Sequence, residues 1–86
     1  MTNYSKKHLN ETIKALNTLI EEGRRYVDTK TIRRINEISS SDRSRINFIW
    51  RSLQNLKEEG YLEVNGRKSP KLYLIKTEEK IDLEED

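Results

Sequence analysis

The chain has 86 residues, of which 33% are hydrophobic and 37% are charged, and its formal net charge at pH 7 is +2. A chain of this length forms one domain with a small core, and its regularly spaced apolar residues exclude a disordered chain. It contains no Cys, which excludes disulfides and Cys-based zinc sites. Because so small a core gives marginal stability, we expect dimerisation to supplement it.

The charges are distributed unevenly along the chain. Residues 1–76 carry 16 Lys and Arg against 9 Asp and Glu, a net charge of +7, whereas residues 77–86 carry one Lys against six acids, a net charge of −5. A basic domain attracts polyanions through phosphate contacts and counterion release. Lys and Arg are also the ordinary residues of a solvated surface. The positions of these residues in the predicted elements therefore distinguish a polyanion-binding surface from an ordinary solvated one.

The sequence predicts an intracellular, cytoplasmic protein without membrane association. No apolar run approaches the roughly 20 residues that cross a bilayer, and the first residues lack the apolar core of a signal peptide.

The first predicted element is a helix over residues 5–22, with Ser5 as N-cap and Gly23 just past its end. Its apolar positions recur at spacings of four and three, which places them on one face: Leu9, Ile13, Leu16 and Ile20. Ala15 and Leu19 flank this face and are either further core or the seam of a dimer. We expect His8, the single histidine, at the surface.

A short strand is predicted over residues 24–27, followed by a second helix over residues 30–38 with Asp28 or Thr29 as its cap. Three isoleucines at a spacing of three are expected to face inward: Ile32, Ile35 and Ile38. The run of serines at 39–41 has poor helix propensity and forms the predicted turn.

The third predicted helix covers residues 42–59, with Ser41 as N-cap and Gly60 as its stop. One face is apolar and is expected to face the core: Ile46, Ile49, Trp50, Leu53 and Leu56. The opposite face carries Ser44, Asn47, Phe48, Arg51 and Asn55.

A β-hairpin is predicted at the end of the domain. The β-rich runs 61–64 and 71–76 flank residues 65–70, which begin with Asn-Gly, a strong hairpin signal, and end with Pro70. Arg67 and Lys68 lie at the tip of this loop, with Lys71 beside them.

The succession of elements over residues 29–76 resembles a winged helix-turn-helix. The resemblance is most specific at Leu53-Gln54-Asn55-Leu56-Lys57-Glu58-Glu59-Gly60-Tyr61-Leu62, where the end of a helix runs through a glycine into a strand, as in MarR and PadR regulators. It implies an α+β, mainly α fold with three helices and a wing that is a β-hairpin of two to three strands. This domain would occupy residues 1–76, and residues 77–86 would be a solvated acidic tail or a segment that docks on a partner subunit.

In such a domain the N-terminal half of the third helix reads bases in the major groove. Arg can form two hydrogen bonds to guanine and Asn two to adenine. The predicted base contacts are therefore Arg43, Ser44, Arg45, Asn47, Phe48 and Arg51. The two arginines of the first turn reach either bases or phosphates, and Phe48 either contacts a thymine methyl or a sugar or is buried.

A second group of residues is predicted to contact the DNA backbone or the minor groove: Lys30, Arg33, Arg34, Asn55, Arg67, Lys68 and Lys71. Such contacts position a protein on DNA and raise its affinity without reading the base sequence of the major groove. The alternative for the tip of the hairpin is a solvated loop.

The predicted function is sequence-specific binding of double-stranded DNA by a homodimeric transcriptional regulator, on a palindromic site with half-sites roughly 34 Å apart. An alternative is a plasmid-partition protein that binds a centromere-like site and spreads along DNA, because the chain is similar in size and composition to small winged-helix proteins of archaeal plasmids and viruses.

An alternative from another class is a winged-helix module that binds proteins, with the acidic tail as a contact. An enzyme is not expected, because there is no Cys, only one His, no Gly-rich phosphate loop and no metal-ligand spacing. No cofactor or metal is predicted.

Overall fold

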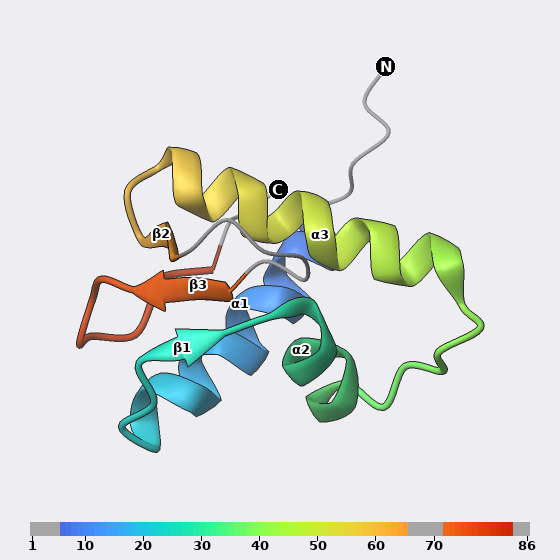
Figure 1. Cartoon of the computed structure of the whole chain (residues 1–86), viewed down its shortest axis with the longest axis horizontal. Coiled ribbons are helices and arrows are strands. Elements are labelled where there is room, and N and C mark those ends of the chain that lie inside the picture. Colours follow the sequence, from blue (N-terminus) through green and yellow to red (C-terminus); the bar gives the residue numbers. More distant parts are fainter. Residues whose placement is uncertain (1–5, 66–71, 84–86) are drawn as a thin grey trace.

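In the described part of the chain, three helices and three strands follow one another in the order α1, β1, α2, α3, β2, β3 (Figure 1). The computed structural model describes residues 6–65 and 72–83. The helices are α1 (Lys6–Glu21), α2 (Thr29–Ile35) and α3 (Arg43–Glu58), and the strands are β1 (Tyr26–Val27), β2 (Leu62–Asn65) and β3 (Leu72–Ile75). This confirms a small, mainly helical α+β domain. No helix of the described part is long and apolar enough to cross a membrane.

The strands form one antiparallel sheet in the order β1-β3-β2. Leu62 pairs with Ile75 and Asn65 pairs with Leu72, which confirms the hairpin, and Val27 of β1 pairs with Tyr73 on the other side of β3. The side chains of Val27, Leu62, Tyr73 and Ile75 are buried, so one face of the sheet closes the core beneath the helices.

A single core joins the helices to the sheet. The apolar face of α1 supplies Leu9, Ile13 and Leu16 to it, as the spacing predicted. Ala15 and Leu19 are both 2% exposed. These two residues therefore belong to the core of the chain and offer no exposed seam to a partner.

All three helices end in the same way, with a residue of positive φ at the C′ position. Gly23 (φ 79°) and Gly60 (φ 94°) take this position after α1 and α3, and Glu37 (φ 56°) takes it after α2. After α2, the amide of Glu37 donates to the carbonyl of Arg34, and the amide of Ile38 donates to the carbonyl of Arg33. This pair of bonds is the Schellman motif, and it ends α2 three residues before the predicted end at residue 38.

Aspartates cap the starts of α2 and α3. The side chain of Asp28 accepts a hydrogen bond from the amide of Thr31 at 2.8 Å, as one of the two predicted alternatives for α2. The side chain of Asp42 accepts from the amide of Arg45 at 3.2 Å. The prediction of Ser41 as the cap of α3 was therefore wrong by one residue, because the longer carboxylate reaches the free amides of the first turn.

Two apolar residues lie elsewhere than the sequence predicted. Ile35, expected in the core, is 36% exposed, because α2 ends there and the chain turns away. Ile81 of the tail, expected to be solvated, is 5% exposed. Its amide donates to Oδ1 of Asn17 at 2.8 Å, and Nδ2 of Asn17 donates to its carbonyl at 3.0 Å, so this part of the tail docks on α1 of its own chain.

Candidate nucleic-acid interface

The surface of α3 that faces outward differs from the predicted one by a small rotation of the helix. Ile49, Leu53 and Leu56 face the core as expected, and Ser52 joins them with its side chain fully buried. Trp50, which was predicted to be in the core, is 45% exposed. The apolar face of α3 is thus centred away from Trp50 and towards the side of the helix that carries Phe48.

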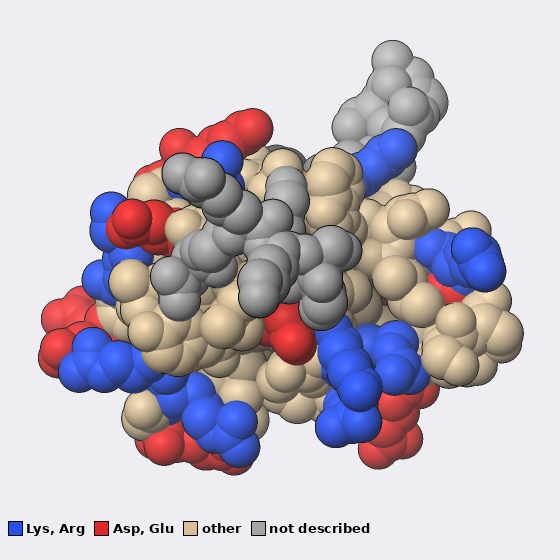
Figure 2. Space-filling model, viewed as in Figure 1, with Lys and Arg blue, Asp and Glu red and all other residues tan. Residues whose placement is uncertain are grey.

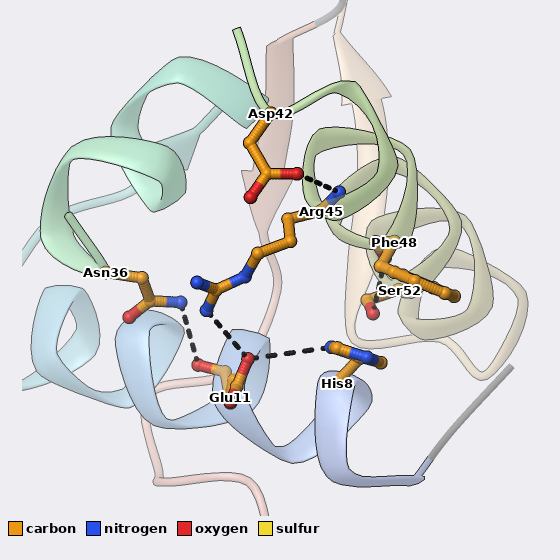
Figure 3. A network of polar contacts seen from close by, with 7 residues as sticks. All are labelled: His8, Glu11, Asn36, Asp42, Arg45, Phe48 and Ser52. Atoms are coloured by element: carbon orange, nitrogen blue, oxygen red, sulfur yellow. Dashed lines mark hydrogen bonds and ion pairs between the residues drawn. The ribbon is translucent and has the colours of Figure 1, made fainter. Parts of the chain in front are cut away.

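Polar contacts at Glu11 of α1 join the three helices in one junction at this rotation of α3 (Figure 3). The side chain of Arg45 extends from α3 to the Glu11 carboxylate, with 3.5 Å between Nη2 and Oε1. His8 Nδ1 lies 3.7 Å from the same oxygen, and Nδ2 of Asn36, just after α2, donates to the Glu11 carbonyl at 3.4 Å. Because Arg45 makes this contact, its side chain turns away from the outward face of α3.

Phe48 belongs to the same junction. Its ring is stacked on the His8 imidazole, with 4.1 Å between the ring centroids and 5° between the planes. The side chain is partly buried, which matches the alternative that the sequence left open. The carbonyl of Phe48 also accepts a hydrogen bond from the hydroxyl of Ser52 at 2.8 Å, so the buried hydroxyl has its partner within the helix.

The outward face of α3 is a stripe of polar and cationic side chains around one indole. Arg43, Asn47, Trp50 and Arg51 are all exposed, and the first three follow at spacings of four and three, which places them along one line of the helix. Gln54 continues this line. Between the cap Asp42 and Glu58 the helix sequence contains no acid, so nothing on α3 itself offsets the positive charge of this stripe.

Gln54 is tied to the sheet at the end of the stripe. Its Oε1 accepts a hydrogen bond from the hydroxyl of Tyr73 at 3.1 Å, which links β3 to α3. Burial raises the pKa of this Tyr73 hydroxyl above its ordinary value. The contact leaves the amide of Gln54 held in one orientation beside Trp50.

The cations of α2 divide into two kinds. Lys30 and Arg34 are exposed. The guanidinium of Arg33 instead donates to the carbonyl of Ile38 at 3.1 Å and stabilises the end of α2. Figure 2 shows Lys and Arg side chains gathered over α2 and near the start of α3 on the same side of the molecule, with mainly uncharged surface between them and with Asp or Glu side chains beside each group.

The structure therefore brings together only part of the predicted site. Ser44 is exposed in the first turn of α3, whereas Asn55 is partly buried at its end. Arg67, Lys68 and Lys71 lie outside the described residues. The sequence prediction missed the exposure of Trp50. The signal that indicates this exposure is Phe48, because the centre of the predicted apolar face of α3 moves away from Trp50 when Phe48 is counted as an apolar residue.

Within residues 6–65 and 72–83, no three His, Asp or Glu side chains lie close enough together to hold a metal ion. Comparison of the chain with models of protein families, with curated protein sequences and with solved structures finds no match.

Proposed function

We propose that this chain binds double-stranded DNA and that α3 is the helix that enters the major groove. The outward face of α3 carries this proposal, because it presents Arg43, Asn47 and Arg51 with no carboxylate between Asp42 and Glu58. Arg and Asn are the side chains that best match the groove edges of guanine and adenine. A helix with its side chains is about 10–12 Å across, which fits the major groove, about 12 Å wide.

The arrangement of the elements supports a winged-helix architecture. Helices α2 and α3 are joined by the short turn of residues 36–42 and pack against each other, and β2 and β3 form a hairpin directly after α3. In a winged helix the second helix of such a pair reads DNA while the hairpin touches the flanking backbone. Contacts by Arg67, Lys68 and Lys71 at the hairpin tip stay predictions from the sequence.

Phosphate contacts are assigned to the exposed cations near α3. Lys30 and Arg34 of α2 are free of the hydrogen bond to Ile38 that engages Arg33. Arg43 stands in the first turn of α3, where the amide dipole also favours a phosphate. Arg45 and Arg33 are left out of the proposed contacts, because each holds a position within the fold.

Sequence-specific regulation by a homodimer stays a prediction, as does the plasmid-partition alternative. Both use the same surface of α3, so they differ in how the protein occupies a long DNA. A regulator protects a stretch of fixed length, whereas a protein that spreads protects a stretch that lengthens as its concentration rises. Nuclease footprinting over a range of protein concentrations distinguishes the two.

Fluorescence anisotropy with a labelled mixed-sequence duplex of about 25 base pairs tests DNA binding itself. We expect a dissociation constant of about 1–100 μM at physiological salt, the usual range of non-specific binding. If Lys30, Arg34 and Arg43 each contact a phosphate, the slope of log K against log salt will be about −3. No binding at low salt would refute the proposal and favour the protein-binding alternative.

A matched pair of variants controls for net charge. Arg43→Gln removes one cation from the proposed interface, and Lys80→Gln removes one from the tail, where Lys80 pairs with Glu21 of α1. We expect the first variant to flatten the salt slope by about one unit and the second to leave it unchanged. Equal effects would indicate attraction by overall charge without a defined interface.

A further inference from the structure

Trp50 is exposed where the apolar stripe of α3 borders its polar outward face. It is the single Trp of the chain, and almost half of its surface is accessible to solvent. The other large apolar residues that are exposed in the described ranges lie on β1, α2, β3 and the tail. Trp50 is therefore the one such residue of these ranges that belongs to α3.

The fold does not account for the position of Trp50. Ile49 and Leu53 fill the core beneath α3, and Phe48 takes the aromatic contact with α1. An indole that the core does not use has a large apolar surface available to a ligand. Aromatic side chains with this mixture of apolar surface and exposure dominate the energetics of interfaces.

The neighbours of Trp50 indicate what kind of surface it meets. Asn47 lies one turn before it and Gln54 one turn after it, on the same line of the helix, and Arg43 and Arg51 add positive charge. Amides are the side chains that pair with adenine in the major groove. Because Oε1 of Gln54 already accepts from the Tyr73 hydroxyl, the stripe offers adenine the amide of Asn47, one turn before the apolar surface of Trp50.

We propose that Trp50 reads thymine, by packing its indole against the C5-methyl group in the major groove. This inference rests on the proposed DNA binding and adds a base preference to it. The thymine methyl is the apolar group that base pairs present in the major groove, and apolar side chains distinguish thymine by contact with it. A polar side chain at position 50 would forgo this contact.

The spacing on α3 sets where the thymine lies. With a rise of about 1.5 Å per residue, Asn47 and Trp50 are separated by about 4.5 Å along the helix axis and lie on one line of α3. Because side chains one turn apart on a helix in the major groove reach the same stretch of the groove, we expect the thymine read by Trp50 next to the base pair that faces Asn47. We expect the preferred site to contain a thymine beside an adenine contacted by Asn47.

Replacement of thymine by deoxyuridine tests the inference, because it removes only the methyl group. The full chain first selects duplexes from a library with 20 randomised base pairs, and each thymine of the selected duplex is then replaced singly. We expect one thymine per bound α3 to be sensitive, with a loss of affinity of about fourfold, the effect of one buried methyl group. The Trp50→Ala variant should bind the thymine and deoxyuridine duplexes equally.

The emission of Trp50 gives a second measurement on the unaltered protein. Since the chain has a single Trp, its fluorescence reports this site alone. We expect bound DNA to shift the emission of Trp50 and to protect it from quenching by acrylamide. A duplex with deoxyuridine at the sensitive position should produce a smaller shift and less protection. Thermal unfolding of Trp50→Ala and Trp50→Phe controls for folding. Because more than half of the surface of Trp50 is covered by the protein, we expect some loss of stability in Trp50→Ala and a smaller loss in Trp50→Phe, with both variants folded under the conditions of the titration.

The outcomes separate this inference from the proposed function. Binding of DNA with no thymine-sensitive position, or with the same sensitivity in Trp50→Ala, would overturn the role of Trp50 and leave DNA binding intact. The same holds if selected sites lack thymine or if the Trp50 emission does not respond to bound DNA. Absence of binding to any duplex at low salt would overturn both.

Discussion

The imidazole of His8 and the ring of Phe48 stack almost in parallel, with 4.1 Å between their centroids, and they join the start of α1 to the middle of α3. The stack holds Phe48 against α1 and adds to the burial of Ile49, Leu53 and Leu56, which turn the same side of α3 towards the core. Offset stacked rings contribute about 0.5–1.5 kcal/mol beyond the surface that they bury.

A double-mutant cycle with His8→Ala and Phe48→Ala measures this contact. We expect a coupling free energy of about 0.5–1.5 kcal/mol in chemical unfolding, with Phe48→Ala the more destabilising single variant because it loses the larger apolar surface. Additive effects of the two substitutions would show that the stack does not stabilise the fold.

A second prediction concerns the end of α2. Glu37 has a φ of 56° at a position where Gly23 and Gly60 stand in the other two helices. A residue with a side chain costs roughly 1–2 kcal/mol in this left-handed conformation, and a glycine at the same position avoids this cost. Part of this gain in stability is lost, because a glycine has more conformational freedom in the unfolded chain. We expect Glu37→Gly to raise the free energy of unfolding by about 0.5–1 kcal/mol. Glu37→Ala keeps the strain and serves as the control, so an equal gain in both variants would contradict this account.

These two places show why sequence reasoning reached the order of the elements but not their details. The apolar spacing of α1 and the glycines after α1 and α3 are local signals, and they gave both helices nearly to the residue. The end of α2 has no such signal, because a glutamate adopts the glycine conformation there.

The contacts on either side of the outward face of α3 involve residues far away in the sequence. Phe48 and Trp50 lie on opposite edges of the apolar stripe, and periodicity within the helix locates the centre of this stripe only when Phe48 is counted as apolar. The same spacing places Arg45 nearer to the buried side of α3 than Arg51. The partners of Phe48 and Arg45 on α1 follow from no local pattern.

A third prediction concerns the tail. Ile81 is 5% exposed and exchanges two hydrogen bonds with the side chain of Asn17, which lies 64 residues earlier in the chain. We expect Ile81→Ala to lower the free energy of unfolding by about 2 kcal/mol, the lower end of the range for a buried isoleucine, because the tail can detach. Leu83→Ala, at a residue that is 43% exposed, should change it by less than about 0.5 kcal/mol.

Hydrogen exchange gives an independent test of the same contact. The amide of Ile81 donates to Oδ1 of Asn17, so we expect it to be protected in the native protein and to exchange rapidly in Asn17→Ala. Rapid exchange of this amide in the native protein would show that the tail does not dock.

A fourth prediction is a loss of stability at high pH. Burial raises the pKa of the Tyr73 hydroxyl in the folded protein above its unfolded value of 10.0. The unfolded chain therefore loses this proton first, so the contribution of Tyr73 is fully present below pH 10 and decreases as the pH rises through the folded pKa. Tyr73→Phe has no such proton, and the decrease in stability above pH 10 should be smaller in this variant. If the free energy of unfolding fell equally with pH in the two proteins, the assignment of this decrease to Tyr73 would be wrong. Other groups that titrate equally in both proteins do not affect the comparison.

The last prediction compares two arginines of one helix. Arg51 is exposed on the outward face of α3, whereas Arg45 reaches the Glu11 carboxylate. If Arg51 reads a base, Arg51→Ala should weaken binding to the preferred site by about 1–3 kcal/mol and leave the free energy of unfolding unchanged.

Arg45→Ala should have the opposite profile. It removes a partly exposed ion pair, so we expect a loss of stability of about 0.2–1 kcal/mol, with little effect on DNA affinity measured where the protein is fully folded. Anisotropy titrations and chemical unfolding of both variants make the comparison. A larger loss of affinity in Arg45→Ala than in Arg51→Ala would mean that Arg45 leaves Glu11 to contact DNA, and the outward face of α3 would then have to include its first turn on the α1 side.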